Sequence, residues 1–231
     1  DPWPPRQPYS STPARRTSPP GWIRRDARGV DLSDAFSRVS HALILKRLVK
    51  FGLSSYIIRF VHEWLRDRKG RVFHDGVRSE WVRLLAGVPQ GSVLGPLLFL
   101  IFIDDLFVVL DTVGEDVRRG RDIETMSLGF ADDLSLLVQG VDRTSVGNAM
   151  QIMLTALSSW CTANGMTVSA KTSVMVFRRG QGDGSKVPYL SLADGNHRFD
   201  PTEKSHRLLG WMLDRQLNFA DHALKVKLQL M

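Results

Sequence analysis

The spacing of apolar residues predicts four helices in this chain. In three of them, the first, second and fourth, hydrophobic side chains recur every three or four positions, which gathers them on one helical face. Ser54 can cap the start of the second helix, and Gly70 and Gly165 are placed to end the second and the fourth. The third is apolar enough to be buried on all sides. The predicted helices span residues 41–50, 54–69, 93–110 and 144–164.

Shorter apolar runs predict strands between these helices. Asp75 and Gly76 lie between two β-like runs within residues 71–85, which is the signal of a hairpin. Residues 115–124 are charged and predict a loop. Because strands and helices do not alternate regularly, we expect an α+β fold with helices packed on one face of a sheet. The other predicted strands span residues 30–36, 126–130, 134–138, 173–177, 189–192 and 208–213.

The first 28 residues differ from the rest of the chain in composition. They hold six arginines and two aspartates, and seven of the 11 prolines in the chain fall between Pro2 and Pro20. Such a segment buries too little apolar surface to offset the entropy of ordering, so we expect residues 1–28 to be a disordered leader. A basic arm that binds nucleic acid is the alternative interpretation, which we favour less.

Charge and composition narrow the classes of function. A net charge of +7 and a pI near 9.9 suit a partner that carries phosphates. The single cysteine, Cys161, excludes a disulfide framework and a cysteine-rich zinc site. The longest apolar run is short and ends at Asp104 and Asp105, so we expect no membrane span and place the two acids at a helix terminus. The polar, proline-rich start is unlike a signal peptide.

Two adjacent aspartates, Asp132 and Asp133, stand between the apolar runs 128–130 and 134–138. If both runs are strands, the turn presents these acids at one end of a sheet. Carboxylates this close repel each other, and a divalent cation such as Mg²⁺ removes the repulsion. A strand that ends at Asp31 could lie beside this hairpin, so that carboxylates from two strands clamp two metal ions. The alternative is an ordinary solvated surface turn.

A glycine-rich loop precedes the third predicted helix. Residues 87–96 contain three glycines and two prolines. Glycines let the backbone approach a ligand closely, and Ser92 could cap the helix that follows. The N-terminus of that helix would favour a phosphate or a base edge. The alternative is a plain connection between a loop and a helix.

Along the chain, the segment around Asp31, the glycine-rich loop and the turn with Asp132 and Asp133 follow each other in this order. Together they resemble the motifs of reverse transcriptases, in particular the enzymes of non-LTR (LINE-like) retrotransposons. The resemblance rests on residues 30–41 (VDLSDAFSRVSH), residues 87–99 (GVPQGSVLGPLLF) and residues 130–133 (FADD). Residues 170–172 (AKT) look like the family's lysine motif, and residues 208–214 (LLGWMLD) look like its primer-grip hairpin. The likeness runs from about Val30 to the C-terminus.

The resemblance implies a fold, an activity and partners. The fold is a right-hand polymerase palm, with an antiparallel sheet and packed helices. The activity is that of an RNA-directed DNA polymerase, which adds nucleotides to a primer 3′-hydroxyl with the help of two Mg²⁺ ions, or Mn²⁺ in their place. The partners are an RNA template, a DNA primer and deoxynucleoside triphosphates, inside the cell and in the nucleus, with no membrane.

The resemblance also implies roles for individual residues. Three carboxylates would bind metal, and Lys171 would approach the triphosphate and protonate the leaving pyrophosphate. The metal-binding residues would be Asp31, Asp132 and Asp133. Asp34 and Ala35 would offer backbone N–H groups to the triphosphate, and Phe36 would lie under the sugar and disfavour a 2′-hydroxyl. Gln90 and Gly91 would contact the templating pair and the incoming nucleotide.

The chain departs from the family pattern at several points. Phe130 stands where the family usually has tyrosine, and Ser37 stands where it often has aspartate. By the resemblance, residues 1–28 do not look like the basic fingers region that would precede Val30, and we expect residues after Phe219 to correspond to the start of a thumb. We therefore expect a leader over 1–28, a palm with partial fingers over 29–215 and the start of a truncated thumb over 216–231. A catalytically inactive remnant that still binds nucleic acid is the alternative; a DNA-templated or template-independent polymerase is disfavoured by the Gln90 motif.

Overall fold

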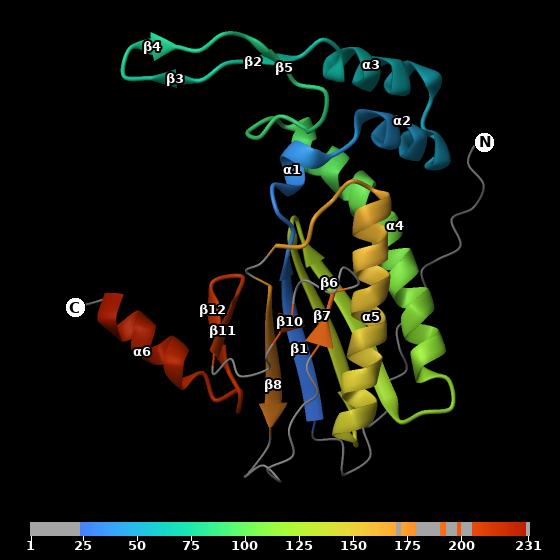
Figure 1. The fold of residues 1–231 in the computed structure, drawn as a ribbon, viewed down its shortest axis with the longest axis vertical. Coiled ribbons are helices and arrows are strands. Elements are labelled where there is room, and N and C mark those ends of the chain that lie inside the picture. The colour runs from blue at the N-terminus through green and yellow to red at the C-terminus, as the bar shows by residue number, and fades with distance from the viewer. Residues whose placement is uncertain (1–23, 170–171, 179–189, 193–197, 200–204, 230–231) are drawn as a thin grey trace.

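The computed structural model describes residues 24–169, 172–178, 190–192, 198–199 and 205–229. Its centre is an antiparallel sheet with the strand order β6-β7-β1-β8 (Figure 1). Helices and strands follow each other in a non-alternating order, which confirms the predicted α+β class. The four strands are β1 (Arg24–Asp31), β6 (Ile123–Phe130), β7 (Asp133–Gly140) and β8 (Ser173–Arg178).

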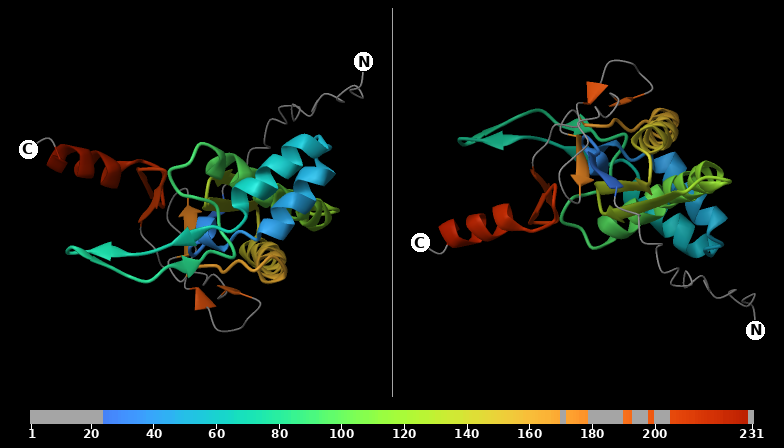
Figure 2. Two further views of the ribbon diagram at one scale, coloured as in Figure 1. Left: turned by 90° about the horizontal axis from the view of Figure 1, so that it is seen from above. Right: turned by 90° about the horizontal axis from the view of Figure 1, so that it is seen from below.

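Two long helices, α4 (Leu94–Arg118) and α5 (Arg143–Ala163), cover one face of this sheet (Figures 1 and 2). Helix α4 packs on β6, and α5 packs on β7. The backbone of β6 comes so close to α4 that a Cβ atom at Gly129 would collide with the ring of Phe107. Helix α5 agrees with its prediction, whereas α4 extends through residues 115–118, which were expected to form a loop.

The first strand differs from its prediction, because β1 begins at Arg24 and ends at Asp31 instead of spanning residues 30–36. Residues 24–28 show no apolar alternation. They form a strand because β7 pairs with them on one side and β8 on the other, which satisfies the backbone whatever the side chains are. The predicted boundary after residue 28 therefore falls inside β1. Residues 1–23 of the predicted leader lie outside the described residues.

After β1, the chain forms α1 (Ala35–Arg38), α2 (His41–Lys50) and α3 (Ser55–Leu65). Helix α2 has the predicted bounds. The Ser54 hydroxyl accepts a hydrogen bond from the Ile57 backbone N–H, which confirms the predicted cap of α3. Helix α3 ends at Leu65, before Gly70, because the backbone at Arg66 is extended.

A two-stranded arm projects from the end of α3, away from the rest of the molecule (Figures 1 and 2). The turn at its tip consists of Asp75 and Gly76, both with positive φ, which confirms the predicted hairpin. The arm's strands make few contacts with the body, and most of its side chains are exposed. Its strands are β2 (Lys69–Gly70), β3 (Phe73–His74), β4 (Val77–Arg78) and β5 (Val82–Arg83).

Asp104 and Asp105 do not end a helix, as was expected, but lie inside α4. The carboxylate of Asp105 accepts a hydrogen bond from the guanidinium of Arg47 at 2.8 Å and another from Trp160 Nε1 at 3.1 Å. Arg47 is buried and also donates to Asn164 Oδ1 at 2.7 Å. The charge of Asp105 is therefore compensated at the junction of α2, α4 and α5, so the helix continues past it.

The C-terminal part of the described chain lies beside β8 (Figure 1). The single strand expected over residues 208–213 is two paired strands, which turn at Leu209 and Gly210. Within the described ranges, no helix has the length and apolar character needed to cross a membrane. The remaining elements are β9 (Leu190–Ser191), β10 (Arg198–Phe199), β11 (Ser205–Leu208), β12 (Trp211–Asp214) and α6 (Ala220–Gln229).

Candidate active site

The two adjacent aspartates lie at the tip of the β6–β7 hairpin. Phe130 pairs with Asp133, so that Ala131 and Asp132 alone form the turn. Ala131 has a φ of 53°, a left-handed conformation that tight hairpin turns require and that residues other than glycine rarely adopt. Asp132 is half-buried and Asp133 is exposed. The predicted presentation of both acids at one end of the sheet is confirmed.

Strand β1 brings the third candidate acid to the same end of the sheet. The Cα atoms of Asp31 and Asp133 are partners in the ladder between β1 and β7. Strand β1 ends at Asp31, as the sequence suggested, and directly beside the acidic hairpin. Positions 31, 132 and 133 therefore cluster, although they come from distant parts of the chain.

These positions belong to the face of the sheet that α4 and α5 leave uncovered. Successive side chains of a strand point to opposite faces. Because Leu134 is buried in the core beneath the helices, Asp133 lies on the other face. The residues of β6 on that other face are exposed, and three of them, Met126, Leu128 and Phe130, are apolar, whereas Glu124 at the far end of the strand is charged. The acidic end of the sheet thus adjoins an open, partly apolar surface.

The segment after β1 holds the next three candidate residues. Asp34 adopts a left-handed conformation, with a φ of 50°, and its carbonyl oxygen accepts hydrogen bonds from the N–H groups of Ser37 and Arg38. Ala35 is buried in the core. The ring of Phe36 stacks on the buried ring of Phe99, with centroids 4.6 Å apart. Phe36 is therefore held in one orientation by the body of the protein.

The glycine-rich loop is attached to that same segment. The backbone N–H of Val88 donates to the carbonyl oxygen of Phe36 at 2.8 Å, and that of Gly87 donates to Val39 at 2.8 Å. A side chain at Gly87 would be strained, because its φ is +85° and a Cβ atom would lie 2.7 Å from the Ser37 carbonyl oxygen. The structure thus brings the loop and the Asp34–Phe36 segment together, as the site hypothesis required.

Within this loop, the two candidate contact residues are exposed. Gln90 and Gly91 both face solvent, and Gly91 has a φ of +79°. The helix that follows has Val93 in the capping position, not Ser92 as expected. The Ser92 hydroxyl nevertheless accepts a hydrogen bond from the Gly95 backbone N–H at 3.0 Å and donates to the Pro89 carbonyl oxygen at 2.7 Å. These bonds fix the loop and leave Gln90 and Gly91 accessible.

Lys171 lies outside the described residues, so its predicted role stays a prediction. The segment just before it is described, and it lies beside the end of β1. The N–H of Ser33 donates to the Thr167 carbonyl oxygen at 2.9 Å, and Leu32 forms a β-bridge with Val168.

The donor set at the sheet end suits a hard divalent cation, because carboxylate oxygens are the ligands that Mg²⁺ prefers. Among the residues whose side chains the structure describes, which do not include Asp31, no group of three or more His, Cys, Asp or Glu is arranged to hold a metal ion. Asp132 and Asp133 supply two carboxylates, and the backbone register supplies a third position. The two-strand clamp remains a prediction.

The sequence reading overlooked a group of basic residues next to the glycine-rich loop. Arg68 Nη1 donates to the Gly87 carbonyl oxygen at 2.9 Å, and Arg66 and Arg83 lie nearby around a pocket. In the sequence, the run Arg66-Asp67-Arg68-Lys69 falls at the end of the helix predicted over residues 54–69, and no motif marks it as a site.

Comparison with known proteins identifies relatives of this chain. Residues 28–213 match the family described as reverse transcriptase (RNA-dependent DNA polymerase). The RNA-directed DNA polymerase from mobile element jockey of Drosophila melanogaster is 30% identical over 200 residues, which cover 86% of this chain and 20% of that protein. The retrovirus-related Pol polyprotein from the type-1 retrotransposable element R2 of Popillia japonica is 32% identical over 108 residues, which cover 47% of this chain and 18% of that protein. The chain spans about a fifth of the length of these relatives.

Solved structures show the same fold. Apo telomerase of Candida tropicalis, truncated from the C-terminal domain, superposes with a TM-score of 0.56 at 13% identity, over 85% of this chain and 35% of that one. Telomerase of Candida albicans, in complex with a fragment of telomeric RNA, superposes with a TM-score of 0.51 at 15% identity, over 84% of this chain and 31% of that one. At these identities the likeness establishes the fold alone. The family match contains all three aspartates of the sheet end and runs to Leu213, and we conclude that the chain belongs to the reverse transcriptase (RNA-dependent DNA polymerase) family.

Proposed function

We propose that this chain is the palm of an RNA-directed DNA polymerase, which extends a primer 3′-hydroxyl along an RNA template. The observation that carries the proposal is the pairing of Asp31 with Asp133, one residue from Asp132, at one end of the sheet. Family membership supports the polymerase class, and the helix-free face beside the acids supports a surface for a primer–template duplex. The β11–β12 hairpin would be the primer grip, and α6 would begin the thumb.

In this proposal, Asp31, Asp132 and Asp133 hold two Mg²⁺ ions, or Mn²⁺. When bound, the ions supply positive charge to the attacking 3′-oxygen and to the leaving pyrophosphate. The chain supplies the positioning: a rigid antiparallel ladder sets the distance between position 31 and the hairpin tip. Phosphoryl transfer relies on positioning and on charge stabilisation, which is what a fixed group of carboxylates provides.

The nucleotide would lie between the end of β1 and the glycine-rich loop. Backbone N–H groups at Asp34 and Ala35 would contact the triphosphate, and Lys171 would reach the same phosphates. The Phe36 ring, held by its stack on Phe99, would form the floor beneath the sugar. Gln90 and Gly91 would contact the templating pair, from a loop whose backbone is bonded to residues 36–39.

A primer-extension assay tests this function. The purified chain is given an oligo(dT) primer on a poly(rA) template, with dTTP and Mg²⁺, and product length is read on a gel. We expect extension that chelation of the metal abolishes, and weaker extension on a poly(dA) template. Strand binding without extension on either template would contradict the polymerase and favour a binding remnant of the family.

A further inference from the structure

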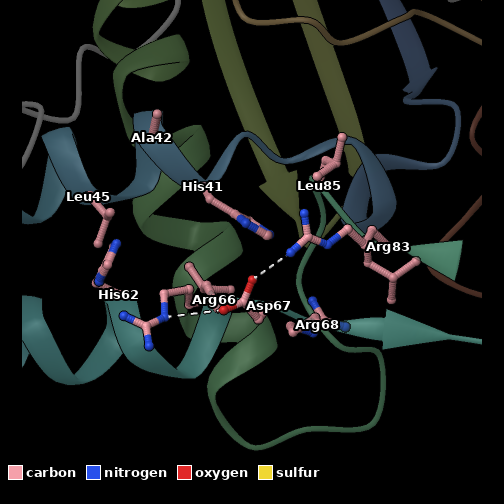
Figure 3. Close-up of a pocket in the computed structure, with 11 residues that line it drawn as sticks. His41, Ala42, Leu45, His62, Arg66, Asp67, Arg68, Arg83 and Leu85 are labelled. Carbon is pink, nitrogen blue, oxygen red and sulfur yellow. Dashed lines mark hydrogen bonds and ion pairs between the residues drawn. The ribbon is translucent and has the colours of Figure 1, made fainter.

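A pocket lined by basic residues lies beside the glycine-rich loop and outside the acidic site. It has a volume of about 330 Å³ and sits between α2, the end of α3 and the base of the arm. Figure 3 shows how its side chains converge from these elements. Its polar lining consists of His41, His62, Arg66, Asp67, Arg68 and Arg83, and its apolar lining consists of Ala42, Leu45, Leu65, Leu84 and Leu85.

The charges around this pocket do not cancel. Three guanidinium groups line it and one carboxylate, Asp67, faces them. Asp67 is shared between Arg83 Nη2 at 3.2 Å and Arg66 Nε at 3.5 Å (Figure 3). Arg66 also contacts Glu63, outside the lining, at 3.1 Å. Even with Glu63 counted, two carboxylates face three guanidiniums, so the pocket keeps a net positive charge and attracts an anion.

The basic character continues from the pocket along the arm, where it alternates with exposed aromatic rings. The guanidinium of Arg71 lies 4.5 Å from the centroid of the Trp81 ring, and that of Arg78 lies 5.8 Å from that of Phe73. The side chains of Trp81 and Phe73 are 57% and 64% exposed. Exposed rings beside cations are the arrangement on which proteins stack the bases of single strands.

The pocket is also connected to the loop that would contact the template. The carbonyl oxygen of Gly87 is bonded to His41 Nε2 at 2.8 Å and to Arg68 Nη1 at 2.9 Å. Both side chains line the pocket, and Gly87 begins the segment that contains Gln90. A strand held in the pocket would therefore lie next to the residues that are proposed to contact the templating base.

We propose that this pocket and the adjoining arm bind the phosphodiester backbone and bases of a single nucleic-acid strand. The pocket would take phosphates through Arg66 and Arg83, and the arm would stack bases on Trp81. A polymer is favoured over a small phosphate ion because the basic and aromatic positions extend from the pocket along the arm. Strand binding itself does not depend on the proposed polymerase function. Only the identification of this strand as the template rests on that function.

Fluorescence anisotropy with a labelled single-stranded RNA of about 16 nucleotides tests the proposal. It is done with chelator and without nucleotides, so that it reads strand binding even in a protein that does not polymerise. The double variant Arg66→Gln/Arg83→Gln removes two exposed cations. We expect its affinity to fall roughly tenfold at low salt, and the slope of log affinity against log salt to decrease by about 1.4, since each contact with a single strand contributes about 0.7.

The matched control is Arg119→Gln/Arg121→Gln. It changes net charge by the same amount, at the far end of α4 from the arm (Figure 1), on residues that are also exposed. The control should keep the wild-type salt slope. Trp81→Ala should weaken binding about fivefold or more without changing that slope, because stacking is not a charge interaction. Circular dichroism melts confirm that each variant is folded.

Tripolyphosphate as a competitor separates a strand from a free phosphate group. We expect it to displace the RNA only at a phosphate concentration well above that of the RNA itself. If tripolyphosphate competes at equal phosphate concentration, the pocket is a site for small anions and the proposal is wrong. An unchanged salt slope in Arg66→Gln/Arg83→Gln, or an equal loss in the control, would overturn it as well, whatever the polymerase assay shows.

Discussion

Asp31 and Asp133 are direct partners across two antiparallel strands, although β1 and β7 are separated by helices α1 to α4 and by the whole arm. Paired positions in a sheet share a face. The ladder therefore sets the spacing between the two acids with the rigidity of a sheet, and the tight turn adds Asp132. An acidic centre built in this way does not depend on flexible loops. Metal-assisted chemistry needs such fixed positions for its ligands.

Removing a carboxylate from the hairpin tip should abolish activity and spare the fold. We expect Asp132→Asn to lower primer extension by at least about 100-fold, because metal-assisted transfer loses several kcal/mol of charge stabilisation. Its free energy of unfolding in urea should change by about 0.5 kcal/mol or less, since the turn buries little. Asp104→Asn, at an exposed position of α4, is the control and should extend primers normally. Wild-type extension by Asp132→Asn would refute the assignment.

Shortening Phe36 should change both sugar selection and stability. Phe36→Val opens the space beneath the sugar, so the ratio of ribonucleotide to deoxyribonucleotide incorporation should rise at least tenfold. Because the ring stacks on Phe99, the variant should also lose about 1–2 kcal/mol of unfolding free energy. Competitive incorporation and urea titration measure the two effects. Lost stability with an unchanged ratio would make Phe36 a packing residue only.

The buried contact between α2 and α4 gives a stability prediction. The side chain of Arg47 is 8% exposed and that of Asp105 is 35% exposed. Asp105→Leu leaves the buried guanidinium without its carboxylate, and we expect a loss of about 2–3 kcal/mol. Asp105→Asn keeps an acceptor and should cost less. Urea unfolding compares the two variants, and equal losses would show that the stabilisation comes from the charge of Asp105 and that its hydrogen-bond acceptor is immaterial.

Two truncations test the start of the fold. Removing residues 1–28 deletes five residues of β1 that pair with both neighbours, so we expect a loss of about 3 kcal/mol or more of unfolding free energy relative to removal of residues 1–23. Thermal and urea unfolding of the two truncated chains provide the comparison. Superimposable unfolding curves would mean that residues 24–28 are not an integral strand.

Cys161 should be unreactive in the native protein. Its burial raises the pKa of the thiol to about 12, because the thiolate would lose its hydration. At pH 8 a thiol reagent should therefore react only when the chain unfolds, with a rate that follows urea unfolding. Since the folded pKa lies above the unfolded value of about 8.5, the associated stabilisation is complete below that pH and is lost as the pH rises toward 12. Rapid native labelling would contradict the burial.

The sequence predicted the parts of the fold that carry a periodic pattern or a specific turn. Helices α2 and α5, the arm hairpin and the acidic hairpin all have such signals, and each lies where it was expected. Residues 24–28 and Asp105 were misread for one physical reason. Both are mostly polar, and partners far along the chain place them inside an element. Strands β7 and β8 flank residues 24–28 in β1, and Arg47 and Trp160 bind Asp105 in α4.

The candidate site followed the same rule. The motif residues around Asp31, Gly87 and Asp132 were recognisable one by one, and their adjacency required the sheet register and the bonds between residues 36–39 and the loop. The pocket of arginines escaped notice because its members are common surface residues in sequence. They become a site only when the chain brings α2, the end of α3 and the base of the arm together around one pocket.

The position of β1 in the sheet also sets the order of events during synthesis. This strand leaves the ribosome before either neighbour exists, since β7 and β8 are made much later. Long-range pairing of this kind is slow, and an unpaired strand is a template for pairing with other chains. The sequence Arg24-Arg25-Asp26-Ala27-Arg28 is charged where central strands are usually apolar. Because like charges on copies of this strand repel each other, we expect the unpaired strand to resist pairing with its copies until β7 and β8 have been made.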